Sequence, residues 1–202
     1  MAAEQITFRP ETGPVYTVEN ECQDCYKCVR HCHCKAIRII NGAASVIRDA
    51  CVSCGQCVKV CPAHAKRIRS DLSRLRQLLT SGEPVYASIA PSWVGYFQGV
   101  SLGELSEALH RLGFAGVSET AHGAQAVSAY TGQYLSQGRH PLVISSACPA
   151  CVDYIRKYHP DFTARIMPFT SPVQAHCKLI KKRYGDNAKV VFFGPCAAKK
   201  NE

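Results

Sequence analysis

The stretch Cys22-Gln-Asp-Cys25-Tyr-Lys-Cys28-Val-Arg-His-Cys32 has the spacing C-x2-C-x2-C-x3-C, and Cys51-Val-Ser-Cys54-Gly-Gln-Cys57-Val-Lys-Val-Cys61 repeats it. Each cysteine of the second copy lies 29 residues (51 − 22) after its counterpart in the first. The segments behind the two motifs also match, since Ala36-Ile-Arg-Ile39 corresponds to Ala65-Lys-Arg-Ile68. This part of the sequence is therefore an internal duplication.

The spacing is typical of iron–sulfur ligation. A [4Fe-4S] cubane needs one thiolate on each iron, and gaps of two residues let one short loop reach three of them. In the bacterial two-cluster pattern the fourth thiolate comes from the other motif. We therefore predict that one cluster binds Cys22, Cys25, Cys28 and Cys61, and that a second binds Cys51, Cys54, Cys57 and Cys32. Zinc ribbons also use C-x2-C pairs, but a zinc site has no use for a third cysteine at the same spacing.

The composition agrees with a folded protein that uses its thiols as metal ligands. Of 202 residues, 47% are hydrophobic and 19% are charged, which excludes wholesale disorder. The 13 cysteines are an odd number and cannot all pair as disulfides. Residues 1–5 have no basic or apolar leader, and the longest uncharged run, residues 84–103, contains prolines, serines and glycines. We expect a cytoplasmic protein with no membrane segment.

Two residues depart from the repeat. His33 stands where the second motif has Pro62, and Cys34 is an additional thiol. We expect His33 to face solvent and Cys34 to pack as a small hydrophobic residue, although either could alter the environment of the neighbouring cluster.

The chain is predicted to form two domains. Residues 1–67 form an α+β ferredoxin-like two-cluster domain, and residues 68–83 form a connecting helix and linker, the helix covering Ala65 to Thr80. Residues 84–202 form an α/β domain with a mainly parallel sheet, because apolar strands alternate with helices. The predicted strands are 84–90, 114–119, 141–145 and 189–193, and the predicted helices are 102–112, 121–136, 150–158 and 171–184.

Three loops follow predicted strands directly, and two of them carry cysteine. They are Ala90-Pro91-Ser92, Ser146-Ala147-Cys148-Pro149 and Gly194-Pro195-Cys196. Sites in parallel sheets gather at the carboxyl ends of the strands, so we expect these loops to converge on one crevice.

These loops, together with the cysteine repeat, resemble the iron-only ([FeFe]) hydrogenases over nearly the whole chain. The resemblance rests on Ala90-Pro91-Ser92, on Ser145 to Pro149, and on Gly194-Pro195-Cys196-Ala-Ala-Lys199-Lys-Asn-Glu202. It implies that Cys148 and Cys196 are ligands of the cubane half of the hydrogen-activating cluster. It also implies catalytic-site roles: Ser92 and Pro91 line the pocket, Lys199 lies near a diiron cyanide, and Glu202 is the final acid of the motif.

The departures from the family pattern favour its divergent, sensory-type branch. The proton-carrying cysteine of the family is Ala147 here, its tryptophan is Cys151, and its methionine is Gly194. The family's third cysteine motif does not occur before Glu202, so we expect the chain to lack the C-terminal third of the catalytic domain and to show little or no hydrogen turnover. As an alternative, four cysteines could hold a third cubane by themselves: Cys148, Cys151, Cys177 and Cys196.

The leading functional prediction is electron transfer through two [4Fe-4S] clusters joined to a hydrogenase-like domain. The alternatives are a hydrogen or redox sensor whose C-terminal or signalling domain is missing, and a non-catalytic carrier of iron–sulfur clusters. The net charge of +9 suits docking of an acidic ferredoxin- or flavodoxin-like redox partner. Basic residues are not interleaved with aromatic ones, so we expect no nucleic-acid partner.

Overall fold

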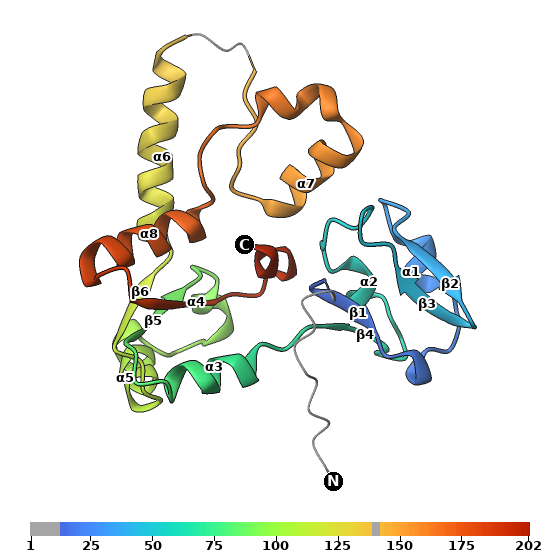
Figure 1. The fold of residues 1–202 in the computed structure, drawn as a ribbon, viewed down its shortest axis with the longest axis horizontal. Helices are drawn as coiled ribbons and strands as arrows, with labels where there is room; N and C mark the ends of the chain where they lie inside the picture. The colour runs from blue at the N-terminus through green and yellow to red at the C-terminus, as the bar shows by residue number, and fades with distance from the viewer. Residues whose placement is uncertain (1–12, 139–141) are drawn as a thin grey trace. The chain divides into compact units, whose positions relative to one another are not determined.

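The computed structural model describes residues 13–138 and 142–202 (Figure 1). Its contacts divide the chain into two compact units, which we call the ferredoxin unit and the sheet unit. The ferredoxin unit comprises the described residues up to Arg69 together with Cys196–Glu202, and the sheet unit comprises Ser70–Pro195. Residues 1–12 of the predicted ferredoxin-like domain lie outside the described residues.

The ferredoxin unit consists of short strands and single helical turns around the cysteines. Its elements are β1 (Val15–Thr17), η1 (Glu19–Glu21), α1 (Lys27–Arg30), β2 (Ile37–Ile40), β3 (Ala43–Val46), α2 (Gln56–Lys59), β4 (Lys66–Ile68) and η3 (Ala197–Asn201). Strand β1 pairs antiparallel with β4, and β2 pairs antiparallel with β3. The predicted helix from Ala65 was wrong at its start, because Lys66–Ile68 bonds to β1 as a strand.

The backbone conformation repeats with the same 29-residue offset as the sequence. Helix α2 begins and ends 29 residues after α1 (56 − 27 and 59 − 30). Three pairs of residues at the same offset have a positive φ: Asp24 and Ser53, Tyr26 and Gly55, and Lys35 and His64. Left-handed backbone is costly for residues other than glycine, so its recurrence indicates that each loop needs the same tight turns to present its cysteines.

The end of the chain packs on the ferredoxin unit. Asn201 Nδ2 donates to Ser53 Oγ at 3.1 Å, and Arg69 Nη2 donates to the carbonyl of Lys200 at 3.3 Å. The segment Cys196–Glu202 therefore belongs in space with residues that precede it by more than a hundred positions.

The sheet unit is a small parallel α/β layer structure. Its elements are α3 (Leu72–Leu79), β5 (Val85–Ile89), α4 (Trp93–Tyr96), α5 (Leu102–Arg111), β6 (Gly116–Glu119), α6 (Ala121–Ser136), α7 (Pro149–Tyr158), η2 (Pro160–Arg165), α8 (Pro172–Tyr184) and β7 (Lys189–Phe193). The strand order is β6-β5-β7, and both pairings are parallel.

Helices cover both faces of the central strand β5. Val85, Ala87 and Ile89 point to one face and pack with Leu109 of α5 and Phe114. On the opposite face Tyr86 stacks on Tyr184 of α8 with ring centroids 4.3 Å apart. The predicted two-sided parallel sheet is confirmed, in a three-stranded form.

The predicted strand at 141–145 was wrong. Its described part makes a single parallel bridge, between Ile144 and Ile166, and does not join the sheet. The chain turns directly afterwards, because Ser145 Oγ accepts the N–H of Ala147. Hydroxyl groups that bond nearby backbone in this way compete with strand pairing.

No helix in the part of the chain that the structure describes is both long and apolar enough to cross a membrane.

Candidate metal centres

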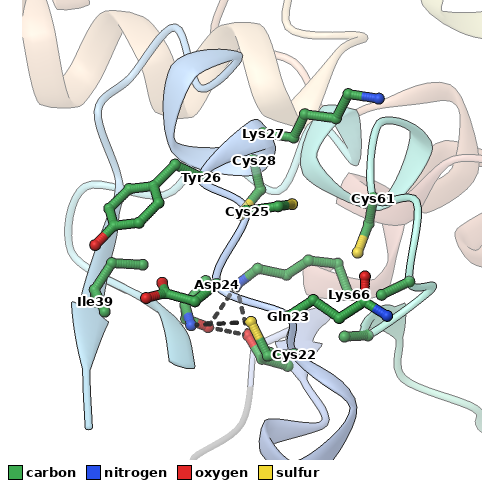
Figure 2. A pocket seen from close by; sticks show the side chains of 14 residues that line it. Cys22, Gln23, Asp24, Cys25, Tyr26, Lys27, Cys28, Ile39, Cys61 and Lys66 are labelled. Carbon is green, nitrogen blue, oxygen red and sulfur yellow. Dashed lines mark hydrogen bonds between the residues drawn. The ribbon is translucent and has the colours of Figure 1, made fainter. Parts of the chain in front are cut away.

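The thiols of the first predicted cluster line one pocket of the ferredoxin unit, which we call the first pocket (Figure 2). Its cysteines are Cys22, Cys25, Cys28 and Cys61. Cys22 follows η1, Cys28 lies in α1, and Cys61 comes from the other repeat, two residues after the end of α2. The pocket therefore gathers three thiols from one motif and one from the other.

A second pocket mirrors the first. It is lined by Cys32, Cys51, Cys54 and Cys57, with Cys32 now the thiol from the opposite motif, and also by the additional thiol Cys34. Among residues 13–138 and 142–202, no group of three His, Cys, Asp or Glu side chains is arranged to hold a single metal ion. A cubane takes one thiolate on each of its irons, so its ligands line a space and do not converge on one ion.

Burial and backbone amides shape the chemistry of these sulfurs. Burial raises the pKa of Cys28 and raises the pKa of Cys57 to about 11, and the Lys66 ammonium acts against burial at both. Iron ligands must be thiolates, so metal binding has to displace these protons. Peptide N–H groups donate to three ligand sulfurs, from Ala44 to Cys22 at 3.5 Å, from Ala36 to Cys32 at 3.3 Å and from Ser53 to Cys51 at 3.3 Å.

Each pocket also has one exposed thiol. Cys25 in the first pocket and Cys54 in the second are exposed, and the two occupy equivalent positions of the repeat. Cys28 is buried, and the other predicted ligands are half-buried. A cluster in either pocket would therefore have one edge close to solvent.

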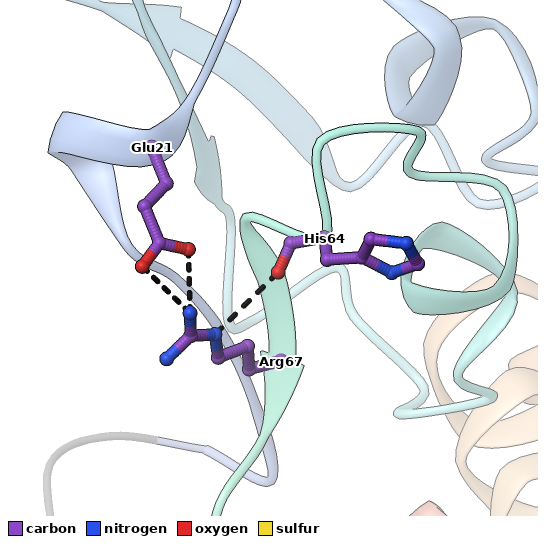
Figure 3. A network of polar contacts seen from close by, with 3 residues as sticks. All are labelled: Glu21, His64 and Arg67. Carbon is purple, nitrogen blue, oxygen red and sulfur yellow. Dashed lines mark hydrogen bonds and ion pairs between the residues drawn. The ribbon is translucent and has the colours of Figure 1, made fainter.

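An ion pair connects the segment that precedes Cys22 with the segment that follows Cys61, and both cysteines line the first pocket (Figure 3). Arg67 Nη2 lies 2.6 Å from both Oε1 and Oε2 of Glu21, and Arg67 Nε donates to the carbonyl of His64 at 3.5 Å. Glu21 immediately precedes Cys22, and His64 and Arg67 follow Cys61. The pair is exposed, so its expected contribution to the free energy of unfolding is only about 0.2–1 kcal/mol.

In the sheet unit, two of the three predicted loops meet. Ser92 lines a pocket of about 310 Å³ with Ala90 from the end of β5 and with Gly194 and Pro195 from the end of β7. Trp93 lines the same pocket and donates its indole N–H to Glu119 Oε1 at 2.9 Å. The predicted convergence is found for these two loops.

The remaining predicted site residues are distributed over both units. Cys148 immediately precedes α7, Cys151 lies in α7 and Cys177 in α8, whereas Cys196 belongs to the ferredoxin unit. A joint site at Cys148 and Cys196 therefore stays a prediction, as does a third cluster. Lys199 Nζ and Glu202 Oε2 form an ion pair at 3.0 Å, and both side chains are mostly buried.

Two buried polar groups were not predicted from the sequence. Lys66 is 2% exposed beside the first pocket. His176 of α8 is also 2% exposed, and its ring nitrogens lie 2.8 Å from Ser88 Oγ and 3.0 Å from Ser118 Oγ. The 29-residue offset could have revealed Lys66, because it pairs this lysine with the apolar Ile37.

Two family models match the chain. Residues 83–202 match the family described as "Iron only hydrogenase large subunit, C-terminal domain". Residues 44–67 match the family described as "4Fe-4S binding domain". The first match covers more than half of the sequence, and the second includes the whole second cysteine motif.

Proposed function

The chain belongs to the iron-only hydrogenase family, and from this membership we propose that it transfers electrons through two [4Fe-4S] clusters attached to a hydrogenase-like domain. The match to a 4Fe-4S binding domain already supports one cluster and its role in electron transfer. The second cluster is our extension of that result.

The observation that carries the proposal is a pair of pockets, each lined by one predicted set of four cysteines, with Cys34 as a fifth cysteine in the second pocket. In each, the set of thiols suits a cubane, with three from one motif and the fourth from the other. A bound cubane would accept and release one electron at a time. The chain's own contribution is to supply thiolates, to donate peptide N–H groups to Cys22, Cys32 and Cys51, and to leave Cys25 and Cys54 open to a partner.

The predicted ligands of the hydrogen-activating cluster do not make a complete set. Cys148 and Cys196 supply two thiolates and lie in different units, whereas a cubane takes four. Ala147 stands at the position of the family's proton-carrying cysteine. Its presence favours a role like that of the sensory-type branch over fast hydrogen turnover.

We propose an acidic redox protein, ferredoxin- or flavodoxin-like, as the electron-transfer partner. Arg30 and Lys59 are exposed and lie in the helical turns that carry Cys28 and Cys57. Positive charge near the site of electron exit steers an acidic partner toward it, and this steering weakens as salt is added.

The test is iron and sulfide analysis with EPR on anaerobically purified protein. We expect about eight irons per chain, as two cubanes require. Cys22→Ser and Cys61→Ser should remove the same EPR signal, and Cys32→Ser and Cys51→Ser should remove the other. Cys34→Ser is the matched control and should retain both signals.

Three results would contradict the proposal. About four irons per chain would reject the second cluster. Loss of the same signal in Cys61→Ser and Cys57→Ser would reject the crossed ligand sets. Transfer of intact clusters to an apo-ferredoxin, without electron exchange with a redox partner, would identify a cluster carrier instead.

A further inference from the structure

Lys66 is a buried cation inside the ferredoxin unit. Only 2% of the residue is exposed. Its Nζ donates to Thr17 Oγ1 at 2.5 Å and to the carbonyl of Ala44 at 3.0 Å. In Figure 2 the side chain extends into the space among the pocket thiols, whereas Lys27 points away from it. Both of these acceptors are neutral oxygens, and an ammonium has three protons to donate.

Nothing in the described protein neutralises this charge. No carboxylate within residues 13–138 or 142–202 lies within ion-pair distance of Lys66 Nζ. A buried ammonium without a counter-ion is strongly unfavourable. The ionisable groups that line the first pocket with Lys66 include Asp24 and the four thiols, which become thiolates when they bind metal. The Lys66 ammonium also acts on Cys57 in the second pocket, where it lowers the pKa of that thiol. The burial of Lys66 is therefore explained if an anionic cluster is its counter-ion.

The duplication supplies an internal comparison. Ile37 is the counterpart of Lys66 in the first repeat, and it lines the second pocket at 7% exposure. The backbone accommodates both residues in the same way, since each begins a strand five residues after a motif's last cysteine. An apolar side chain thus suffices at this position for folding, and the lysine has a different purpose.

We propose that Lys66 is the counter-cation of the cluster in the first pocket and raises its reduction potential above the value that an apolar residue would give. Reduction adds a negative charge to the cluster, and a fixed ammonium against it stabilises the reduced form more than the oxidised form. The inference rests on the proposed function, because it needs a cluster held by Cys22, Cys25, Cys28 and Cys61.

Asp24 carries the opposite charge to Lys66 in the same pocket, so its removal should shift the reduction potential in the opposite direction. Its carboxylate lines the first pocket, and its Oδ1 is buried with no hydrogen-bond partner among the described residues. A negative charge there disfavours reduction. Asp24→Asn removes the charge, and asparagine tolerates the left-handed backbone at this position, where φ is 48°. The midpoint potential should therefore rise in this variant.

The experiment is an EPR-monitored redox titration of the full chain. In Lys66→Met we expect the reduced-to-oxidised ratio of the first-pocket cluster to fall about tenfold at a fixed potential, which is about 59 mV for a one-electron couple. Lys66→Ile, which copies the other repeat, should behave in the same way. Lys27→Met is the matched control, since it removes an exposed ammonium from the same pocket and should move the ratio much less.

The outcomes separate this inference from the proposed function. If wild type holds a single cluster, the two-cluster function fails irrespective of Lys66. If both clusters are present and Lys66→Met leaves the midpoint in place, or Lys27→Met shifts it equally, the inference is overturned. If Lys66→Met and Lys66→Ile do not load iron, normal loading of Lys66→Arg would support the need for a charge. Failure of the arginine variant as well would make the position structural and overturn the inference.

Discussion

The crossing of α6 and α8 depends on Gly123, and we predict that Gly123→Ala destabilises the sheet unit. A Cβ on Gly123 would lie 2.1 Å from the carbonyl oxygen of Pro172, 2.7 Å from the backbone nitrogen of His176 and 2.8 Å from its Cβ. Two of these atoms belong to the backbone, so no side-chain rotation can relieve the contact. The helices would have to separate by about 1.3 Å to bring the shortest contact to 3.4 Å.

The expected change in the free energy of unfolding is the sum of one stabilising and two destabilising contributions. Alanine in a helix interior is more favourable than glycine by about 1 kcal/mol. Overpacking of this severity costs about 3 kcal/mol, the upper end of the usual range. The shift would also stretch the 2.8 Å contact between His176 and Ser88, whose loss costs about 1 kcal/mol. We therefore expect the free energy of unfolding to fall by about 3 kcal/mol.

The assay is urea unfolding followed by the fluorescence of Trp93, the single tryptophan, which lies in the sheet unit. Gly132→Ala is the matched control, because it lies in the same helix and a Cβ added there would have no atom within 4 Å apart from its chain neighbours and the nearby backbone of its own helix. It should stabilise by about 0.5–1 kcal/mol. The reasoning is refuted if Gly123→Ala is as stable as wild type, or if the two substitutions have equal effects.

Two further predictions concern the sheet unit. Ser101 caps α5 and forms a capping box with Glu104, so Ser101→Ala should lower the free energy of unfolding by about 1 kcal/mol in the same urea assay, and an unchanged midpoint would contradict the role of the cap. Burial, with a smaller contribution from His122, lowers the pKa of His176. The unfolded chain then binds a proton below about pH 6.5 that the folded chain does not, so stability should fall as the pH drops through 6.5 toward the lowered pKa, by at most about 1.4 kcal/mol per pH unit. His176→Asn should flatten this dependence, and an equally steep profile in the variant would assign it to other groups.

The cysteine spacing and the alternation of apolar segments predicted much of this structure. The helix expected at 121–136 has those bounds as α6, and the strand expected at 189–193 is β7. The crossed ligand sets stay a prediction, which the cysteines lining the two pockets support. These features depend on local patterns that are repeated within the chain.

Other features depend on contacts that a pattern does not contain. The sequence pattern predicts that Lys66 lies in the helix from Ala65 to Thr80, where a lysine normally faces solvent. Strand pairing with β1 buries it instead. The run at 141–145 is apolar enough for a strand, but the hydroxyl of Ser145 bonds the backbone of Ala147 and the chain turns. The strongest departures from the sequence pattern thus occur where a polar side chain bonds to backbone or lies beside a metal-ligand pocket.

The return of residues 196–202 to the ferredoxin unit has a practical consequence for protein engineering. A gene truncated after Arg69 would encode every cysteine of the two motifs but would omit Asn201. The side chain of Asn201 donates a hydrogen bond to Ser53 Oγ, and Ser53 is only 5% exposed. It would also omit the carbonyl that accepts from Arg69. An electron-transfer module excised from this protein should therefore carry the Cys196–Glu202 peptide grafted behind Arg69 through a short linker. Boundaries drawn on the linear map alone would divide a unit that is continuous in space.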